Sequence, residues 1–405
     1  MKYIIVVPDG MTDVPDEFDD GRTPLVCAKH PIMDDLADRA EVGWAETVPE
    51  GMDPGSDVAA LSIFGLDPRD YYTGRAPLEA ASLGLEIGDG VAYRCNLVTI
   101  RNGVMVDFTA GHITSAEAAE IIQSVHETLG EDGISFYPGV SYRHIMLAPE
   151  SYLGAKCVPP HDITDQSVSG NLPEGEAGPS LRALMDRSTE LLRNHIVNQK
   201  RISKGKNPAT QIWLWGQGKK PTLPTLMERF GLSGAVVTAV DLVKGIGHLV
   251  GLEVMNVQGA TGFVDTNYEG KADAVLEALR RTDFAYAHIE APDEAGHMGD
   301  ADLKKKAIED VDRRFLSRLM DGLDNDPHLQ PYRLLLLPDH PTPISVKTHI
   351  RENVPYLLFD SRAPETKDSK GFTEVSAAAR NSDVIPGHQL IEKLLKQDVN
   401  TSPTE

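Results

Sequence analysis

The chain of 405 residues has few cysteines and no long apolar run. Its three cysteines, Cys27, Cys95 and Cys157, are widely separated and form no C-x-x-C pair, which excludes a disulfide framework and a zinc knuckle. No apolar segment approaches about 18 residues, and no signal core opens the chain, so we expect neither a membrane span nor secretion. Reduced thiols without an export signal indicate a cytoplasmic protein.

Basic residues are also scarce. Lys and Arg number 39 against 61 Asp and Glu, which gives a formal net charge of −22. Such a surface repels a nucleic-acid backbone and an anionic membrane alike, so neither is an expected partner. Part of the acidic excess is instead explained if the chain binds divalent cations. At 405 residues and 41% hydrophobic content, it has room for about two globular domains, while its oligomeric state is not indicated.

A strand, a polar turn and a helix recur along the chain. Residues 3–7 (YIIVV) read as a fully buried strand that ends at Pro8-Asp9-Gly10. Similar strands are expected at 211–215, 235–239, 284–289 and 333–337, and helices at 223–230, 241–250, 271–281 and 302–323. This rhythm predicts an α/β fold with a mainly parallel sheet and helices on both faces. Ligands are then expected at the C-terminal ends of the strands.

The rhythm breaks between residues 81 and 204. This stretch contains hairpin-like strands, helices expected at 115–129 and 181–200, and a Gly/Pro-rich segment at 159–179. We interpret it as an inserted α+β domain, with joins near 75–80 and 204–208. The α/β domain then combines 1–80 with 205–405, and the polar tail at 399–405 is expected to fray.

Several expected strand ends and loops carry carboxylate and imidazole groups. They are Asp9, Asp293, His297, Asp339, His340 and His349. Any one of these residues alone is typical of a helix cap, a turn or the surface. Their conjunction predicts a centre of two metal ions, and the mixed oxygen and nitrogen donors suit Zn²⁺ or Mn²⁺ better than Ca²⁺ or Mg²⁺.

Ser56 lies between Gly55 and Asp57, directly before the helix-like run VAALSIFGL. By residue type alone, Ser and Asp here read as the N-cap of a helix. The functional alternative makes Ser56 a nucleophile at the positive end of that helix, where backbone N–H groups stabilise a phosphoryl group.

Seven segments together resemble a known family. In chain order they are MKYIIVVPDGMTD, PGSDVAALSIFGLDP, YYTGRAPLEAASLG, YPGVSYRHIM, PPHDITD, EAPDEAGHMGD and PDHPTPISVKTH. Their series is similar to that of the archaeal-type, cofactor-independent phosphoglycerate mutases, within the alkaline phosphatase superfamily. The resemblance covers nearly the whole chain and implies an alkaline-phosphatase-like fold and a phosphoserine mechanism.

The resemblance also implies how two divalent ions are held. One ion is assigned Asp9, Ser56, Asp339 and His340, and the other is assigned Asp293, His297 and His349. Mn²⁺ or Zn²⁺ is the first expectation, and Mg²⁺ or Co²⁺ is also compatible.

The same comparison points to Arg143, His161 and Asp162 as residues lining a substrate cleft in the inserted domain. Arg75 suits bidentate binding of a carboxylate or phosphate, and Lys244 lies where a cation neutralises the transferring phosphoryl group. The simpler alternatives are a surface cation at Arg143, a loop turn at His161-Asp162 and a surface lysine at Lys244.

One segment departs from the family pattern. Where the archaeal enzymes carry Arg-Gly-Ala-Gly, this chain has Trp215-Gly216-Gln217-Gly218, followed by Lys219 and Lys220. Either lysine then replaces the missing cation on the substrate phosphate, or the preferred substrate is different. The surrounding segment resembles a bacterial branch proposed to act as homoserine kinases. Alternatively, Trp215 only packs at the end of a buried strand.

Four functions therefore compete. A mutase returns the phosphoryl group to the neighbouring hydroxyl of a phosphoglycerate, and a related enzyme delivers it to another small alcohol such as homoserine. A phosphatase or sulfatase shares the metals, but the inserted domain, a natural lid, argues against an open site. The complete ligand set argues against a non-enzymatic relic. The sequence thus predicts phosphotransfer on a small phosphorylated metabolite, most closely that of a mutase.

Overall fold

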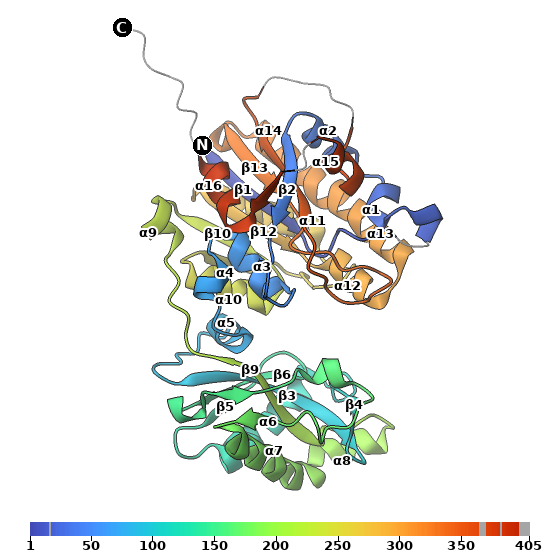
Figure 1. The fold of residues 1–405 in the computed structure, drawn as a ribbon. Coiled ribbons are helices and arrows are strands. Elements are labelled where there is room, and N and C mark those ends of the chain that lie inside the picture. The colour runs from blue at the N-terminus through green and yellow to red at the C-terminus, as the bar shows by residue number, and fades with distance from the viewer. Residues whose placement is uncertain (16–17, 364–369, 381–382, 397–405) are drawn as a thin grey trace. The chain divides into compact units, whose positions relative to one another are not determined.

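The computed structural model describes residues 1–15, 18–363, 370–380 and 383–396 (Figure 1). The chain divides into two compact units, and unit 1 combines Met1–Tyr72 with Leu223–Glu405. Unit 2, Thr73–Thr222, interrupts unit 1 and contains the whole insertion expected at 81–204. The polar tail at 399–405 lies outside the described residues.

Unit 1 is built on an eight-stranded, mixed sheet. In spatial order its strands are β11 (Glu253–Met255), β10 (Gly234–Val237), β12 (Phe284–Ile289), β1 (Lys2–Pro8), β13 (Tyr332–Leu336), β14 (Val354–Asp360), β2 (Glu41–Glu46) and β15 (Val384–Pro386). The first five run parallel, whereas β14 pairs antiparallel with both β13 and β2. The mainly parallel α/β sheet predicted from the sequence is confirmed.

Helices cover both faces of this sheet (Figure 1). They are α1 (Pro24–Cys27), α2 (Pro31–Asp38), α3 (Ser56–Ile63), α4 (Pro68–Tyr71), α9 (Leu226–Phe230), α10 (Asp241–Leu249), α11 (Tyr268–Leu279), α12 (Ala291–Met298), α13 (Ala301–Asp310), α14 (Ser317–Asn325), α15 (Glu374–Arg380) and α16 (Leu390–Leu395). Ile4 and Val6 of β1 share a buried core with residues of α11, α13 and α14. Tyr286 of β12 lies level with Ile5 and so points to the other face. There Phe64, directly after α3, stacks on it with ring centroids 4.2 Å apart.

The single helix expected at 302–323 is interrupted. α13 ends at Asp310, a π-helical turn (η4, Val311–Leu316) follows, and α14 begins at Ser317. The turn buries Asp312, whose carboxylate accepts hydrogen bonds from the N–H groups of Ile32 and Met33 at 3.3 and 2.8 Å. Both N–H groups belong to the first turn of α2, where backbone N–H groups have no acceptor within the helix. Apolar periodicity predicts the buried face of such a helix but not a local widening of this kind.

The strand expected at 211–215 does not belong to the parallel sheet, so that prediction was wrong. β9 (Gln211–Gly218) lies in unit 2 and pairs antiparallel with β3 (Val91–Arg101). β3 also pairs with β4 (Val104–Asp107) and β6 (Arg143–Ala148), and β6 pairs with β5 (Ser135–Tyr137). A short apolar run predicts a strand but not its partner, because either kind of sheet buries it equally well.

The helices of unit 2 pack on both faces of its sheet. They are α5 (Arg75–Ser82), α6 (Ser115–Leu129), α7 (Gly178–Arg193) and α8 (Ile196–Ser203). Ala76 and Ala80 of α5 contact Ala92 and Ile145 on one face, and α6 and α7 contribute to the larger core on the other. The helix expected at 181–200 is two helices, because His195 caps the start of α8. No helix within the described ranges is long and apolar enough to cross a membrane.

Candidate active site

Three neighbouring strands of unit 1 carry ligand-type side chains at their C-terminal ends. Asp9 follows β1, Asp339 follows β13, and Asp293 lies on α12, which begins just after β12. Parallel neighbours end at the same sheet edge, so residues far apart in the sequence come together there. Gly10 lets the segments approach closely, since it has φ +61° and a Cβ atom there would lie 2.6 Å from the Asp293 Cα.

The first cluster contains Asp9, Asp339, His340 and Ser56. The Nε2 atom of His340 lies 3.2 Å from the Ser56 hydroxyl oxygen. The same Nε2 atom is 3.3 Å from Asp339 Oδ2 and 3.8 Å from Asp9 Oδ1. Both carboxylates and the imidazole are almost completely buried. The four side chains that the family resemblance assigns to one ion therefore lie together.

The second cluster contains Asp293, His297 and His349. His297 Nε2 lies 3.1 Å from Asp293 Oδ2, and His349 Nε2 lies 3.5 Å from Asp293 Oδ1. The two Nε2 atoms are 3.0 Å apart. The Nδ1–H of His297 donates to the carbonyl of Lys347 at 3.1 Å, so Nε2 is the atom that carries the lone pair once the ring is neutral. The spacing of four residues on α12 thus presents both its ligands to one point.

The two clusters adjoin, and they include residues that the sequence did not indicate. Ligand atoms of Asp293, His340 and His349 lie within 4.8 Å of one another, as do those of Asp9, Glu290 and Asp293. Glu290 directly follows β12, a position that could have drawn attention to it. His288 is different: its Nε2 lies 3.2 Å from Asp9 Oδ2, but it sits inside an apolar strand and gives no signal in the sequence.

The buried carboxylates have opposed pKa shifts. Burial, together with the charges of Asp339 and Asp293, raises the pKa of Asp9 well above its usual value. Burial also acts to raise the pKa of Asp293, but the hydrogen bonds from His297 and His349 outweigh it and hold that pKa well below its usual value. Three buried carboxylates therefore lie close together, and without further positive charge they repel one another.

The atoms that lack partners are those that a cation would contact. Asp9 Oδ1 and Asp339 Oδ2 are buried and have no hydrogen-bond partner among the described residues. In the second cluster, two imidazole nitrogens converge on one carboxylate. Buried carboxylate and imidazole groups in this arrangement fit divalent metal ions.

Metal uptake by this site should release protons, and affinity should rise with pH. Burial lowers the pKa of His297, but Asp293 more than compensates and raises it to about 9 in the metal-free protein. The ring is then protonated at neutral pH, whereas a ligand must be neutral. Below pH 9, we expect affinity to rise by up to about tenfold per pH unit.

Isothermal titration of metal-free protein in buffers of different ionisation enthalpy measures the released protons directly. Uptake without proton release at neutral pH would contradict the assignment of His297.

A second consequence of the raised His297 pKa concerns the stability of the metal-free protein. Because the folded pKa of His297 is raised, the His297–Asp293 pair stabilises the metal-free fold fully at pH 6.5 and somewhat below, and this contribution is lost as pH rises through 9. It is also lost in strong acid, as pH falls through the depressed pKa of Asp293.

Ser56 does not cap its helix. The cap position of α3 is Gly55, and no side chain accepts a capping hydrogen bond there. Ser56 is the first helical residue, and its hydroxyl group contacts His340 instead. Asp57 lies in the first turn of α3, where its Oδ1 accepts from the N–H of Val58 at 3.0 Å and its Oδ2 accepts from the hydroxyl of Tyr72 at 2.7 Å. The interpretation of Ser56 as only a helix cap is therefore wrong.

A buried ammonium group ties together the loops that carry the ligands. Lys304 of α13 is fully buried and donates to Asp13 Oδ2 at 2.8 Å and to the carbonyls of Thr12 and Thr342 at 2.9 and 2.8 Å. Thr342 in turn donates its hydroxyl to Asp293. Lys304 thus links the segment after β1, the segment after β13 and the helix that follows α12.

Replacing Lys304 with methionine should lower the free energy of unfolding of unit 1 by about 3–5 kcal/mol, because the buried Asp13 carboxylate loses its counter-ion. Urea unfolding measures the effect. The matched control is Lys305→Met on the next position of the same helix, which should shift stability by less than about 0.5 kcal/mol. Equal effects of the two substitutions would contradict the structural role given to the Lys304–Asp13 pair.

Comparison with known proteins places this chain in a family. The sequence profile of 2,3-bisphosphoglycerate-independent phosphoglycerate mutases matches residues 37–198. A probable enzyme of that name from Geobacter sulfurreducens is 49% identical over 98% of this chain and 100% of its own length. The enzyme of that name from Methanosarcina acetivorans is 48% identical over 98% and 100%. The chain belongs to the 2,3-bisphosphoglycerate-independent phosphoglycerate mutase family.

Solved structures agree on the fold of this mutase-family chain. A Pyrococcus horikoshii protein matches with a TM-score of 0.81 and 28% identity, over 97% of this chain and 96% of that protein. The cofactor-independent phosphoglycerate mutase of Thermoplasma acidophilum matches with a TM-score of 0.64 and 24% identity, over 98% and 99%.

The remaining residues predicted for substrate binding lie in unit 2, and the structure brings only some of them together. Arg75 of α5 donates to Glu79 at 3.0 Å, and the charges of both Arg75 and Arg143 lower the pKa of Glu79. His161 packs its ring edge against Trp215, with ring centroids 5.3 Å apart, and lies 3.7 Å from Asp162.

The three predicted lysines are each engaged elsewhere. Lys219 pairs with the exposed Glu150, and Lys220 pairs with the exposed Glu86 at 3.2 Å. In unit 1, Lys244 of α10 pairs with Asp241 at 3.0 Å.

Arg94 on β3 was missed by the sequence analysis. Its guanidinium lies 3.2 Å from Glu79 and stacks over the indole ring of Trp215, 4.5 Å from the ring centroid. It sits within an apolar strand, and only the pairing of β3 with β9 brings it to the residues that were predicted.

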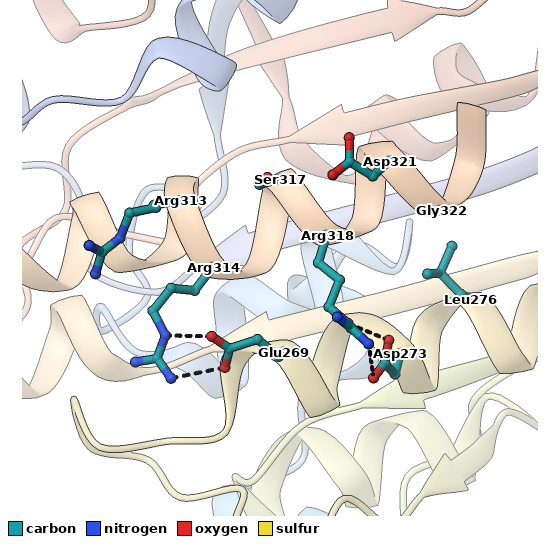
Figure 2. A pocket seen from close by; sticks show the side chains of 9 residues that line it. All are labelled: Glu269, Asp273, Leu276, Arg313, Arg314, Ser317, Arg318, Asp321 and Gly322. Atoms are coloured by element: carbon teal, nitrogen blue, oxygen red, sulfur yellow. Dashed lines mark hydrogen bonds and ion pairs between the residues drawn. The ribbon is translucent and has the colours of Figure 1, made fainter. Parts of the chain in front are cut away.

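Three arginines also line a surface groove in the described part of unit 1, but each is paired with a carboxylate. Figure 2 shows a surface groove of unit 1 along α11, η4 and α14. Arg314 forms two hydrogen bonds with Glu269 at 2.8 and 2.9 Å. Arg318 pairs in the same way with Asp273, and Arg313 pairs with Asp310 at 2.7 Å. Carboxylates therefore neutralise the arginines of this groove in place.

Proposed function

We propose that this chain interconverts 2-phosphoglycerate and 3-phosphoglycerate through a phosphoserine at Ser56, with the help of two divalent metal ions. The observation that carries the proposal is the position of the Ser56 hydroxyl, 3.2 Å from His340 in a buried carboxylate and imidazole centre. Relatives that are 48 and 49% identical over their full length bear the name of this activity.

The two clusters support separate ions. We assign one ion to Asp9, Ser56, Asp339 and His340, and the other to Asp293, His297 and His349. The mixture of oxygen and nitrogen donors favours Mn²⁺ or Zn²⁺ over Mg²⁺, and Co²⁺ is also compatible. When bound, such ions polarise phosphoryl oxygens and lower the pKa of a coordinated hydroxyl.

The transfer proceeds in two half-reactions. In the first, Ser56 Oγ bonds to phosphorus, the phosphate ester bond breaks, and the serine proton ends on the glycerate oxygen. The second half-reaction reverses these changes at the neighbouring glycerate hydroxyl. Ser56 begins α3, so the helix dipole and its free N–H groups favour the anionic phosphoryl group. Water consumes the phosphoserine if it enters, so the mutase outcome requires its exclusion.

Substrate binding is assigned to the residues predicted in unit 2. We propose that Arg75, Arg143, His161 and Asp162 bind the phosphoglycerate, with Lys219 and Lys220 as peripheral cations. In unit 1, Lys244 supplies positive charge during phosphoryl transfer, released from its pair with Asp241.

Trp215 motivates one alternative, transfer to another small alcohol such as homoserine. Two products distinguish the alternatives when metal-loaded protein is examined by ³¹P NMR. With 3-phosphoglycerate alone, the proposal expects 2-phosphoglycerate without added bisphosphoglycerate. With 3-phosphoglycerate or ATP plus homoserine, the alternative expects phosphohomoserine. Inorganic phosphate as the main product would instead indicate a phosphatase and contradict both. A cytoplasmic location stays a prediction from the sequence.

A further inference from the structure

Arg94 is a buried cation that forms few hydrogen bonds and ion pairs. Its residue is only 4% exposed, and its one ion pair within the described ranges is the 3.2 Å contact between Nε and Glu79. That Nε atom is buried and has no hydrogen-bond partner among the described residues. A buried guanidinium with five donors normally finds acceptors, because leaving them unpaired is costly.

The surroundings of Arg94 hold it in place. Arg94 on β3 lies directly opposite Trp215 on β9, and Asn96 lies opposite Arg143 on β6. Residues two apart on a strand share a face, so these four side chains arise on one face of the sheet. The indole N–H of Trp215 donates to Asn96 Oδ1 at 3.1 Å, which orients the ring beneath the guanidinium. Stacking on an aromatic face constrains an arginine without using its donors.

The charges around Arg94 do not balance. Arg75, Arg94 and Arg143 all act on the single carboxylate of Glu79 and lower its pKa. Burial lowers the pKa of Arg94 to about 10, so it stays charged at neutral pH. Burial and the nearby arginines lower the pKa of His144 to about 3, so this ring adds no charge. Among the described residues, three guanidinium groups therefore act on the Glu79 carboxylate, and a concentration of positive charge of this kind favours an anion.

We propose that Arg94, stacked on Trp215, is the principal oxyanion-binding residue of unit 2, and that it binds the carboxylate or phosphate of a small phosphorylated acid. Arg143 and Arg75 contribute charge beside it. The identity of the acid rests on the proposed function, but the binding of an oxyanion does not. Trp215 then supports the guanidinium of Arg94. Arg94, on the neighbouring strand β3, supplies the positive charge that the family pattern has as an arginine at the position of Trp215.

Binding to full-length, metal-loaded Ser56→Ala protein tests this, because ligand is bound without turnover. Calorimetric titration with 3-phosphoglycerate, inorganic phosphate and glycerate compares Arg94→Gln and Arg94→Lys with the parent. Arg187→Gln, an exposed arginine of the same unit, is the matched control. We expect Arg94→Gln to raise the Kd for 3-phosphoglycerate roughly 30-fold or more. Arg94→Lys should have a smaller effect, and the control none.

The simpler probes show which group Arg94 binds. Weaker binding of phosphate alone indicates a phosphate subsite, weaker binding of glycerate alone indicates a carboxylate subsite, and both results support the proposal. Unchanged Kd values for all three probes in a folded Arg94→Lys or Arg94→Gln protein overturn it. If Arg94→Gln does not fold, Arg94→Lys decides, since it keeps the charge but loses the fork of donors.

Turnover by the wild-type protein separates this inference from the proposed function. If 2- and 3-phosphoglycerate are not interconverted but oxyanion binding depends on Arg94, the mutase assignment fails and the binding residue stands. If they are interconverted and KM is unchanged in Arg94→Gln, the mutase assignment stands and the role of Arg94 is refuted.

Discussion

Replacing Ser56 with alanine should abolish turnover and leave the fold intact. The chemistry loses its nucleophile, and loss of such a group lowers kcat by on the order of 10⁴-fold or more. The fold loses little, because Gly55 occupies the cap position and Ser56 makes no capping hydrogen bond. We therefore expect a change of less than about 1 kcal/mol in the free energy of unfolding. Both metal sites keep their carboxylate and imidazole ligands.

The matched control is Ser62→Ala on the same helix. Ser62 is fully buried, and its hydroxyl has no hydrogen-bond partner among the described residues. Its loss should leave turnover close to that of the wild type. The assays are phosphoglycerate interconversion, thermal melting and mass spectrometry of the quenched protein, which should show a phosphoserine at Ser56 in the wild type. More than about a tenth of wild-type activity in Ser56→Ala would remove the phosphoserine mechanism.

Alanine substitutions in the two clusters should each empty mainly one metal site. We expect two divalent ions per chain in wild type and about one in His297→Ala or Asp339→Ala. In His297→Ala, Asp293 and His349 remain as an incomplete set, and in Asp339→Ala the pair of Asp9 and His340 remains. Each loss is local because the clusters take their ligands from different segments, and activity should fall by about 10²-fold or more.

Elemental analysis after gel filtration, on protein never exposed to chelator, gives the stoichiometry. His328→Ala is the control, since His328 is an exposed residue of the 3-10 helix that precedes β13, whereas the ligands follow the other end of that strand. Loss of both ions from either variant would show a single cooperative centre, which is conceivable because the ligand atoms of His340 and Asp293 lie within 4.8 Å. Fewer than two ions in wild type would contradict the assignment of two sites.

The sequence predicted the parallel sheet of unit 1 and the convergence of its ligands, for one physical reason. Apolar runs such as β1 end in polar turns, and parallel neighbours end at the same edge. Asp9 and Asp339 could therefore be placed together before any geometry was known. His297 and Asp293 follow from the period of a helix, because four residues return a side chain to the same face.

Unit 2 was predicted less well, because a short apolar run predicts a strand but does not predict which strand it pairs with. Residues 211–215 read equally as a strand of either sheet, and the structure pairs them with β3. Arg94 was missed for the same reason, since no role can be inferred for an arginine inside a strand until its cross-strand neighbour is known. That neighbour is Trp215, the residue that the sequence marked as a departure from the family.

The sequence by itself determined the kind of fold, the family and the residues able to bind metal, because periodicity and motif spacing are local properties. Only the tertiary structure decided which side chains share a point in space. It added Glu290 and His288 to the centre, moved Ser56 from a capping role to a contact with His340, and gave Trp215 a buried arginine to support. Each of these depends on contacts between residues far apart in the chain. Such contacts depend on how the elements pack, which the local periodicity and motif spacing of a sequence do not predict.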